Sequence, residues 1–152
     1  MSSQISETEL YAPVKAFLEA QGYEVKAEVG PADVVALRDG EAPVIVELKT
    51  GFSLTLFHQG IARLSISDEV YLAVPRGIGR RFQRALAENT RLARRLGLGL
   101  MTVRLETGLV EVQCDPGPYA PRKSVRRSRA LLSEFARRRG GPQTGGMRGG
   151  RG

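Results

Sequence analysis

The sequence predicts an α/β fold with a mixed β-sheet. Apolar residues recur at helical spacing in three stretches, and short apolar runs bounded by glycine, proline or aspartate lie between them, as expected of buried strands. Two closing runs flank a Glu-Thr-Gly turn and predict a β-hairpin. The predicted order is helix, three strands, helix, strand, helix and hairpin, at residues 6–23, 23–29, 32–37, 43–49, 53–66, 69–75, 78–97 and 98–114.

The first helix is predicted from Leu10, Val14 and Leu18, which share one helical face. Ser6 and Glu9 have the spacing of a capping box at its start. Pro13 lacks a backbone N–H and its ring clashes with the preceding turn. We therefore expect the helix either to kink at Pro13 or to begin near it.

Turn residues and apolar spacing predict the next elements. Asp39-Gly40 lies between the second and third strand runs and predicts a hairpin connection. Gly97 is expected to end the helix over 78–97. The helix over 53–66 is expected to bury one apolar stripe, formed by Leu54, Phe57, Ile61 and Leu64.

The net charge of +7 is divided unevenly along the 152 residues. Residues 1–75 hold 5 Lys and Arg against 11 Asp and Glu, whereas 76–97 hold 7 against 1 and 120–152 hold 10 against 1. An acidic N-terminal half followed by two basic segments predicts a polyanionic partner such as nucleic acid. The alternative is a solvated helix face followed by a solubilising tail.

Composition also predicts the organisation and the compartment. The single cysteine cannot form an internal disulfide, the N-terminal residues lack the pattern of a signal peptide, and no apolar run approaches a membrane span. We expect a cytoplasmic protein without membrane contact. We expect three parts: a folded domain over 1–115, a linker and basic helix over 116–139, and a disordered Gly/Arg-rich tail over 140–152.

Charged residues stand at the end of an apolar strand run, where Glu47 and Lys49 follow "PVIV". If 32–37 and 43–49 pair around Gly40, Asp33 lies opposite Glu47. A register shifted by a residue or more is the alternative, because the loop is longer than the tightest type. Two facing carboxylates are destabilising unless a cation lies between them, and Mg²⁺ typically binds through one or two carboxylates plus phosphate. The alternative is an ion pair of Lys49 with Asp33 or Glu47 that has only a structural role at the end of the strand.

These residues carry a resemblance to a known superfamily. "GPADVVAL" followed by "VELKTGFSL" resembles the PD-(D/E)XK nucleases, whose restriction-endonuclease-like fold has an αβββαβ core. The stretch from "ETELYAPVKAFLEAQGYEVKAEV" to "VYLAVPR" is similar to a bacterial family of unknown function described as PD-(D/E)XK-type phosphodiesterases. The resemblance covers about residues 7–140 and implies this core followed by a helix and a β-hairpin.

The resemblance also implies roles for individual residues. Asp33, Glu47 and the Leu48 carbonyl are expected to bind Mg²⁺ or Mn²⁺, and Lys49 is expected to be the catalytic lysine. The first helix is expected to supply one more metal ligand, for which we favour Glu7 with Glu9 as the alternative.

Gln59 resembles a polar active-site residue of related nucleases. Arg63, one turn further along the same predicted helix, is expected to contact a phosphate with it. A solvated Gln–Arg face is the alternative. Further nucleic-acid contacts are expected from Arg80, Arg84 and Arg91.

The sequence therefore predicts a Mg²⁺-dependent phosphodiesterase that hydrolyses DNA or RNA. The alternative is a catalytically silent nucleic-acid-binding module with the same fold and basic tail. An intact Asp…Glu-x-Lys set favours the enzyme. The sequence leaves open whether the protein forms a homodimer.

Overall fold

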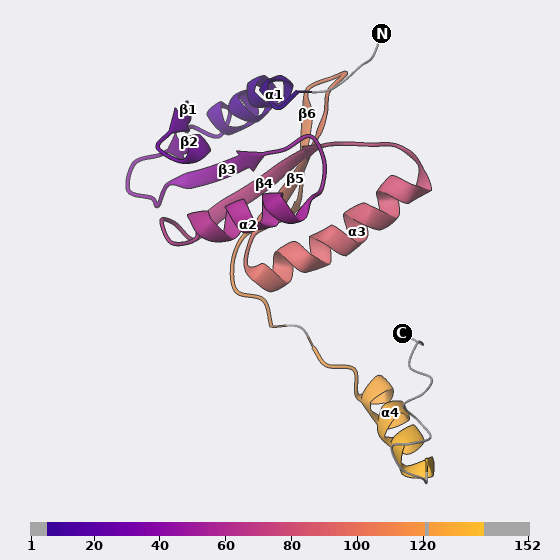
Figure 1. Ribbon diagram of the computed structural model, residues 1–152. Helices are drawn as coiled ribbons and strands as arrows, with labels where there is room; N and C mark the ends of the chain where they lie inside the picture. The colour runs from indigo at the N-terminus through magenta and orange to yellow at the C-terminus, as the bar shows by residue number, and fades with distance from the viewer. Residues whose placement is uncertain (1–5, 121, 139–152) are drawn as a thin grey trace. The chain divides into compact units, whose positions relative to one another are not determined.

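The computed structural model describes residues 6–120 and 122–138. Its contacts divide the chain into a compact unit that ends at Tyr119 and a second unit that begins at Ala120. Among the described residues, the compact unit contains three helices, of 10 to 18 residues, and six strands (Figure 1). Its elements are α1 (Thr8–Glu19), β1 (Glu24–Val29), β2 (Ala32–Leu37), β3 (Val44–Leu48), α2 (Leu54–Arg63), β4 (Glu69–Pro75), α3 (Gly79–Leu96), β5 (Gly99–Arg104) and β6 (Leu109–Cys114).

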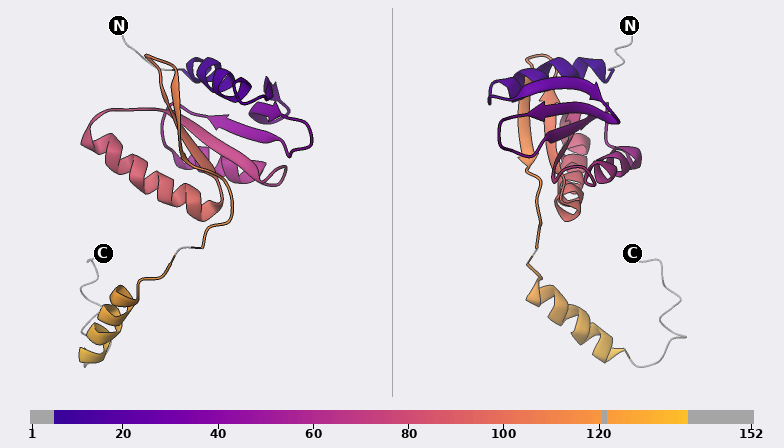
Figure 2. Two further views of the ribbon diagram at one scale, coloured as in Figure 1. Left: turned by 180° about the vertical axis from the view of Figure 1, so that it is seen from behind. Right: turned by 90° about the vertical axis from the view of Figure 1, so that its left-hand side faces the viewer.

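The six strands form one mixed sheet in the order β1-β2-β3-β4-β5-β6. β3, β4 and β5 are parallel, and the remaining neighbours are antiparallel. Two parallel steps in the same direction, each with a right-handed crossover, place both crossover helices on one face. Accordingly α2 and α3 cover one face of the sheet, and α1 covers the other (Figure 2). The predicted α/β class, mixed sheet and αβββαβ core are confirmed.

Each face of the sheet buries its own apolar cluster. Leu10, Val14 and Leu18 of α1 pack with Val34 and Val46 on one face. Ile45 belongs to the opposite cluster, with residues of α2 and α3. Because strand side chains alternate, the odd positions of β3, including Glu47, project toward the α2 side. This alternation decides which helix can contact Glu47.

The first helix runs through Pro13 rather than beginning near it. The Glu9 carboxylate accepts a hydrogen bond from the Ser6 N–H at 3.2 Å, which is one half of the predicted capping box. Gly97 ends α3 in the left-handed conformation, with φ of 81°, as predicted.

The apolar stripe predicted for the helix over 53–66 is correct only in part, because Phe57 is buried and Leu64 is partly buried against the same cluster, but the other two residues are exposed. Leu54 and Ile61 are 68% and 43% exposed, whereas Leu56, Phe57 and Gly60 are buried. Gly60 permits close packing on the sheet, because a Cβ there would lie 2.7 Å from the Leu72 side chain. The helix is therefore rotated from the predicted orientation, and a different face meets β3 and β4.

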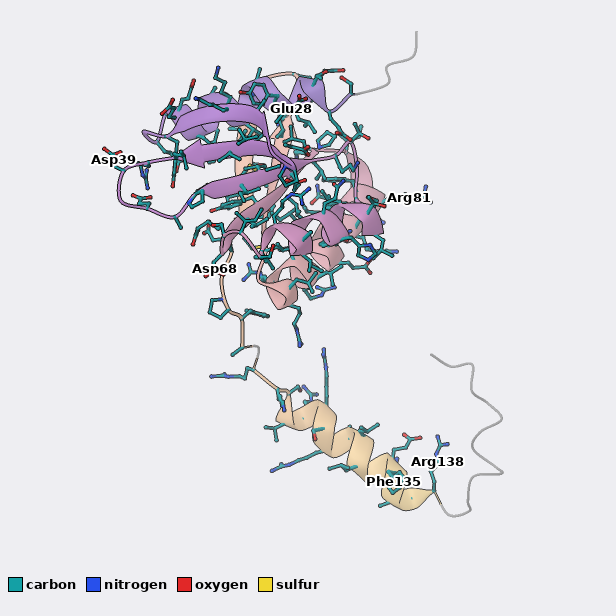
Figure 3. The ribbon with its side chains drawn as sticks, turned by 60° about the vertical axis from the view of Figure 1, so that its left-hand side comes forward. Glu28, Asp39, Asp68, Arg81, Phe135 and Arg138 are labelled. Atoms are coloured by element: carbon teal, nitrogen blue, oxygen red, sulfur yellow. The ribbon has the colours of Figure 1, made fainter. Side chains whose placement is uncertain are left out.

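The second unit contains α4 (Val125–Arg137), capped by the Ser124 side chain, which accepts from the Arg127 N–H at 3.1 Å. None of the helix is buried, and its apolar residues include Phe135, which is labelled in Figure 3 and is 77% exposed. The basic helix predicted for this region is thus present. The predicted disordered tail over 140–152 lies outside the described residues. Within those residues no helix is long and apolar enough to cross a membrane.

Candidate active site

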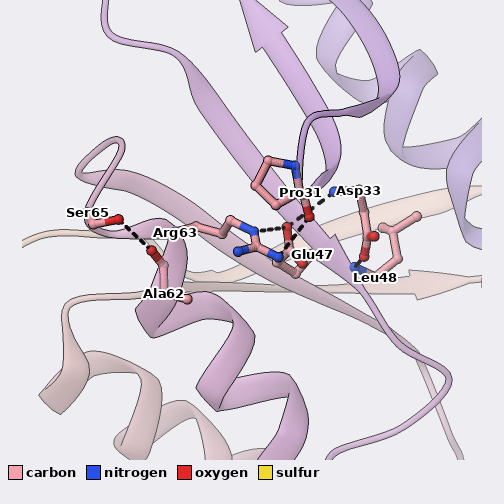
Figure 4. A network of polar contacts seen from close by, with 7 residues as sticks. All are labelled: Pro31, Asp33, Glu47, Leu48, Ala62, Arg63 and Ser65. Atoms are coloured by element: carbon pink, nitrogen blue, oxygen red, sulfur yellow. Dashed lines mark hydrogen bonds and ion pairs between the residues drawn. The ribbon is translucent and has the colours of Figure 1, made fainter.

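The β2–β3 hairpin brings two acidic residues together at one end of the sheet. Its register pairs Val34 with Val46 and Val35 with Ile45, as predicted from the turn around Gly40. At the next pair of positions, Asp33 and Glu47, the strands are joined by hydrogen bonds from backbone amides to side chains. The Asp33 N–H donates to Glu47 Oε2 at 3.2 Å, and the Leu48 N–H donates to Asp33 Oδ2 at 2.9 Å (Figure 4).

Each carboxylate is therefore anchored by a backbone amide of the opposite strand. Asp33 uses Oδ2 and Glu47 uses Oε2 for these bonds. In the part of the chain that the structure describes, no hydrogen bond is recorded to Asp33 Oδ1 or to Glu47 Oε1. One oxygen of each carboxylate is therefore without a hydrogen bond in the described structure.

Arg63 is the basic residue that contacts Glu47. Its Nε donates to Glu47 Oε2 at 3.2 Å, and a terminal nitrogen donates to the Pro31 carbonyl at 2.7 Å (Figure 4). The Arg63 and Glu47 side chains are only 15% and 1% exposed. The rotation of α2 explains this contact, since it turns Arg63 toward the sheet. The alternative of a solvated Gln–Arg face is not what the structure shows.

Gln59 lies one helical turn before Arg63 and is partly buried. Its Oε1 atom is buried and has no hydrogen-bond partner among the described residues. A buried carbonyl oxygen without a donor costs roughly 1–3 kcal/mol. Gln59 is therefore the polar group here whose hydrogen bonding is incomplete.

Lys49 turns toward the first helix. Its Nζ lies 3.4 Å from Glu7 Oε2, in an ion pair whose side chains are 28% and 45% exposed. Glu9 does not join this group, because its carboxylate binds the Ser6 N–H at the helix start. Of the two candidates at the start of α1, Glu7, the N-cap residue, is the one that the fold brings to the Lys49 side of the hairpin.

A cavity of about 240 Å³ adjoins Asp33 on the α1 side. Its lining consists of Glu7, Thr8, Tyr11, Ala27, Glu28, Asp33 and Leu48. Glu28 has a positive φ of 52°, which is uncommon for a residue with a side chain. Sequence reasoning missed Glu28 and Tyr11, since nothing in their spacing relates them to Asp33.

The remaining predicted contact residues lie on α3. Arg80, Arg84 and Arg91 are exposed, and so are the other three arginines of this helix, among them Arg81 (Figure 3). Within residues 6–120 and 122–138, no ion pair is recorded for any of these six side chains. They form an exposed stripe of positive charge without ion pairs in the described structure, called here the α3 arginine stripe; Arg94 also lies 5.9 Å from the centre of the Tyr119 ring.

Burial raises the pKa of the Glu47 carboxyl, and the nearby Asp33 charge raises it further. The hydrogen bond from the Asp33 N–H and the Arg63 guanidinium oppose this change in pKa without cancelling it. The folded environment therefore disfavours the charged form of Glu47 relative to the unfolded chain. A bound cation would reverse this preference.

Glu47→Gln is accordingly expected to raise the melting temperature at pH 7. A carboxyl with a raised pKa in the folded state destabilises that state once the unfolded chain has lost its proton. The gain should therefore shrink as pH falls toward 4.5, the ordinary pKa of the group. Thermal unfolding from pH 4 to 8 measures this change in melting temperature. Glu41→Gln, which alters an exposed ion pair, is the control. A gain in melting temperature that does not depend on pH would contradict the raised pKa of Glu47 as its cause.

The donor chemistry of the pair fits a hard divalent cation. Mg²⁺ and Mn²⁺ favour carboxylate and carbonyl oxygens, and Mg²⁺ commonly binds through one or two carboxylates with water and phosphate completing its shell. Asp33 and Glu47 each have an oxygen without a recorded partner. No group of three or more His, Cys, Asp or Glu able to hold a metal occurs in the described ranges, so other ligands would have to come from outside these side chains.

Comparison with known proteins gives one match to a family. Residues 101–151 match the family described as "Putative PD-(D/E)XK phosphodiesterase (DUF2161)". The chain resembles that family over about its last third. The match supports the resemblance to the PD-(D/E)XK superfamily drawn from residues 7–140. Asp33, Glu47 and Lys49 lie before the matched segment.

A solved structure is also similar to this chain. The crystal structure of an XisH family protein from Nostoc punctiforme, at 1.60 Å resolution, aligns with a TM-score of 0.46 and 18% sequence identity. The alignment covers 72% of this chain and 99% of that chain. No curated protein matches the sequence.

Proposed function

We propose that this protein is a divalent-cation-dependent phosphodiesterase that hydrolyses nucleic acid. The observation that supports it most is at the end of the β2–β3 hairpin. There Asp33 and Glu47 each accept a hydrogen bond from a backbone amide of the other strand. This arrangement holds two carboxylates close together at a cost in repulsion. A structural ion pair would not need both acids.

In this proposal Asp33, Glu47 and the Leu48 carbonyl hold Mg²⁺ or Mn²⁺. When bound, such an ion supplies Lewis-acid and water-activating chemistry at a phosphate. Lys49 leaves its ion pair with Glu7 and holds a phosphate oxygen or orients the attacking water. Its side chain is partly exposed, so it is accessible to a substrate.

Gln59 completes the proposed polar lining of the site. Its buried oxygen lacks a hydrogen-bond donor, and a water or substrate group that donates to it would remove that deficit. We assign Gln59 to substrate or water positioning. The α3 arginine stripe supplies the charge that binds the sugar–phosphate backbone, because its side chains are exposed and without ion pairs in the described structure.

The test is incubation of the protein with single-stranded, duplex and branched DNA and RNA, with and without Mg²⁺ or Mn²⁺. We expect cleavage of at least one substrate only with a cation, and loss of it when the cation is chelated. Cleavage that persists in chelator would contradict the assignment of Asp33 and Glu47 as ligands. This panel also identifies whether DNA or RNA is the substrate.

A second function has one observation in its favour. Glu47 already has Arg63 as a partner and Lys49 already has Glu7, so both charges are balanced within the protein. A catalytically silent nucleic-acid-binding module could have this arrangement. It would bind the same substrates in a salt-dependent manner and cleave none of them with any cation.

A further inference from the structure

Arg63 contacts two parts of the fold that are distant in sequence. It belongs to α2, its Nε binds Glu47 at the end of β3, and its terminal nitrogen binds the carbonyl of Pro31 in the turn before β2. Pro31 lies two residues before Asp33. One guanidinium therefore links the helix to both strands that carry the acidic pair.

Arg63 also determines how the Glu47 carboxylate is held. Glu47 Oε2 accepts from the Asp33 N–H and from Arg63 Nε, both at 3.2 Å. With two donors on the same oxygen, rotation of the carboxylate would break two bonds rather than one. Oε1, with no recorded bond in the described structure, is left as the oxygen for a ligand.

We infer that Arg63 is a positioning residue, which orients Glu47 and holds the turn before Asp33, rather than a phosphate-binding residue. The inference rests on the proposed function and refines the role predicted for Arg63 from the sequence. Its side chain is 15% exposed and two of its N–H groups are committed to protein acceptors. A phosphate would have to reach the remaining N–H groups of a side chain that is largely buried, or displace Glu47 or Pro31.

The chemistry requires arginine at this position. A guanidinium donates in two fixed directions within one plane, whereas an ammonium is a single point donor. Lysine would keep the positive charge near Glu47 but could not keep both bonds in this geometry. Arg63→Lys therefore separates the loss of orientation from the loss of charge.

Arg38 offers a matched control. Its guanidinium also bridges a carboxylate and a backbone carbonyl, with bonds of 2.9 Å to Glu41 and 2.6 Å to Gln21. Neither partner belongs to the proposed site. Arg38→Lys thus removes a comparable pair of guanidinium contacts, and it shows how much such a loss changes the stability of the fold alone.

The first measurement is Mn²⁺ affinity by calorimetry together with steady-state cleavage. Loss of a residue that orients a metal ligand typically costs 10- to 100-fold in metal affinity or activity. We expect Arg63→Lys to weaken Mn²⁺ binding by about tenfold or more and to lower kcat, with little change in KM or in the salt dependence of nucleic-acid binding. Arg38→Lys should match the wild type in all of these.

The second measurement needs no metal. The Asp33 N–H donates to the carboxylate that Arg63 holds, so we expect its hydrogen exchange to be faster in Arg63→Lys. The Lys49 N–H, which donates to the Ala73 carbonyl at 3.1 Å, should exchange as in the wild type. If Arg63→Lys does not fold, Arg63→Gln is used for the exchange measurement, because one amide group cannot replace both bonds; this variant removes the positive charge as well.

The outcomes separate this inference from the proposed function. Unchanged or tighter Mn²⁺ binding in Arg63→Lys, or a raised KM with kcat intact, would overturn the positioning role while leaving the phosphodiesterase in place. An unchanged exchange rate of the Asp33 amide would also overturn it. A wild-type protein that binds no Mn²⁺ and cleaves nothing would overturn both.

Discussion

Replacing Asp33 by Asn or Glu47 by Gln is expected to abolish cation-dependent cleavage. Loss of a metal ligand removes several kcal/mol of transition-state stabilisation, and about 4 kcal/mol corresponds to about a thousandfold in rate. Asn and Gln keep an oxygen that can accept from the Leu48 and Asp33 amides. The fold should therefore survive while Mn²⁺ affinity and turnover fall together.

Calorimetric Mn²⁺ titration, cleavage assays and circular dichroism on the same preparations measure this prediction. Alanine variants are less suitable, because Glu47→Ala would leave the Asp33 N–H and the Nε of Arg63 without their acceptor. Glu41→Gln removes one exposed carboxylate elsewhere and serves as the control. Variants that are folded and bind Mn²⁺ as tightly as the wild type would mean that the ligands are other residues.

The two basic segments are expected to contribute differently to substrate handling. The α3 helix packs on the sheet through Leu86 and Ala93, so its arginines are presented from a fixed surface. Reversing Arg80, Arg84 and Arg91 to Glu should lower cleavage by about a hundredfold even at saturating substrate, because the phosphate backbone is then misplaced at the site. The corresponding triple Lys variant keeps the charge and should remain close to the wild type.

Ending the chain after Tyr119 removes a segment with a net charge of +9, from 10 Arg and Lys against 1 Glu. Residues 6–119 lie within a compact unit that has its own two apolar clusters, so we expect it to fold alone. Binding should weaken by at least about tenfold and lose part of its salt dependence, while cleavage at saturating substrate persists.

Fluorescence anisotropy at several salt concentrations and single-turnover cleavage distinguish the two segments. Each lost phosphate contact on duplex DNA should lower the slope of log affinity against log salt by about 0.9. If truncation abolishes turnover and the α3 reversals have no effect, the substrate path runs through residues 120–152. The assignment of the α3 arginine stripe would then be wrong.

The stripe predicted for α2 illustrates where local patterns were insufficient. Leu54, Phe57, Ile61 and Leu64 fit helical spacing, but the helix buries Leu56 and Gly60 beside Phe57 and leaves Leu54 and Ile61 exposed. The reason is packing: Gly60 lets α2 approach Leu72 of β4, and this contact sets the rotation of the helix. Spacing alone does not reveal that a glycine will be the point of closest approach.

The sequence by itself determined the α/β class, the element order, the hairpin register and the meeting of Asp33 with Glu47. These follow from local periods and a short turn, which act over a few residues. Only the tertiary structure decided that Arg63 binds Glu47 and Pro31, that Lys49 pairs with Glu7, and that Glu28 and Tyr11 border Asp33. Those contacts depend on the rotation of α2 and on how α1 lies across the sheet. The packing of segments that are distant in sequence sets the rotation of α2 and the position of α1, and no local sequence pattern encodes that packing.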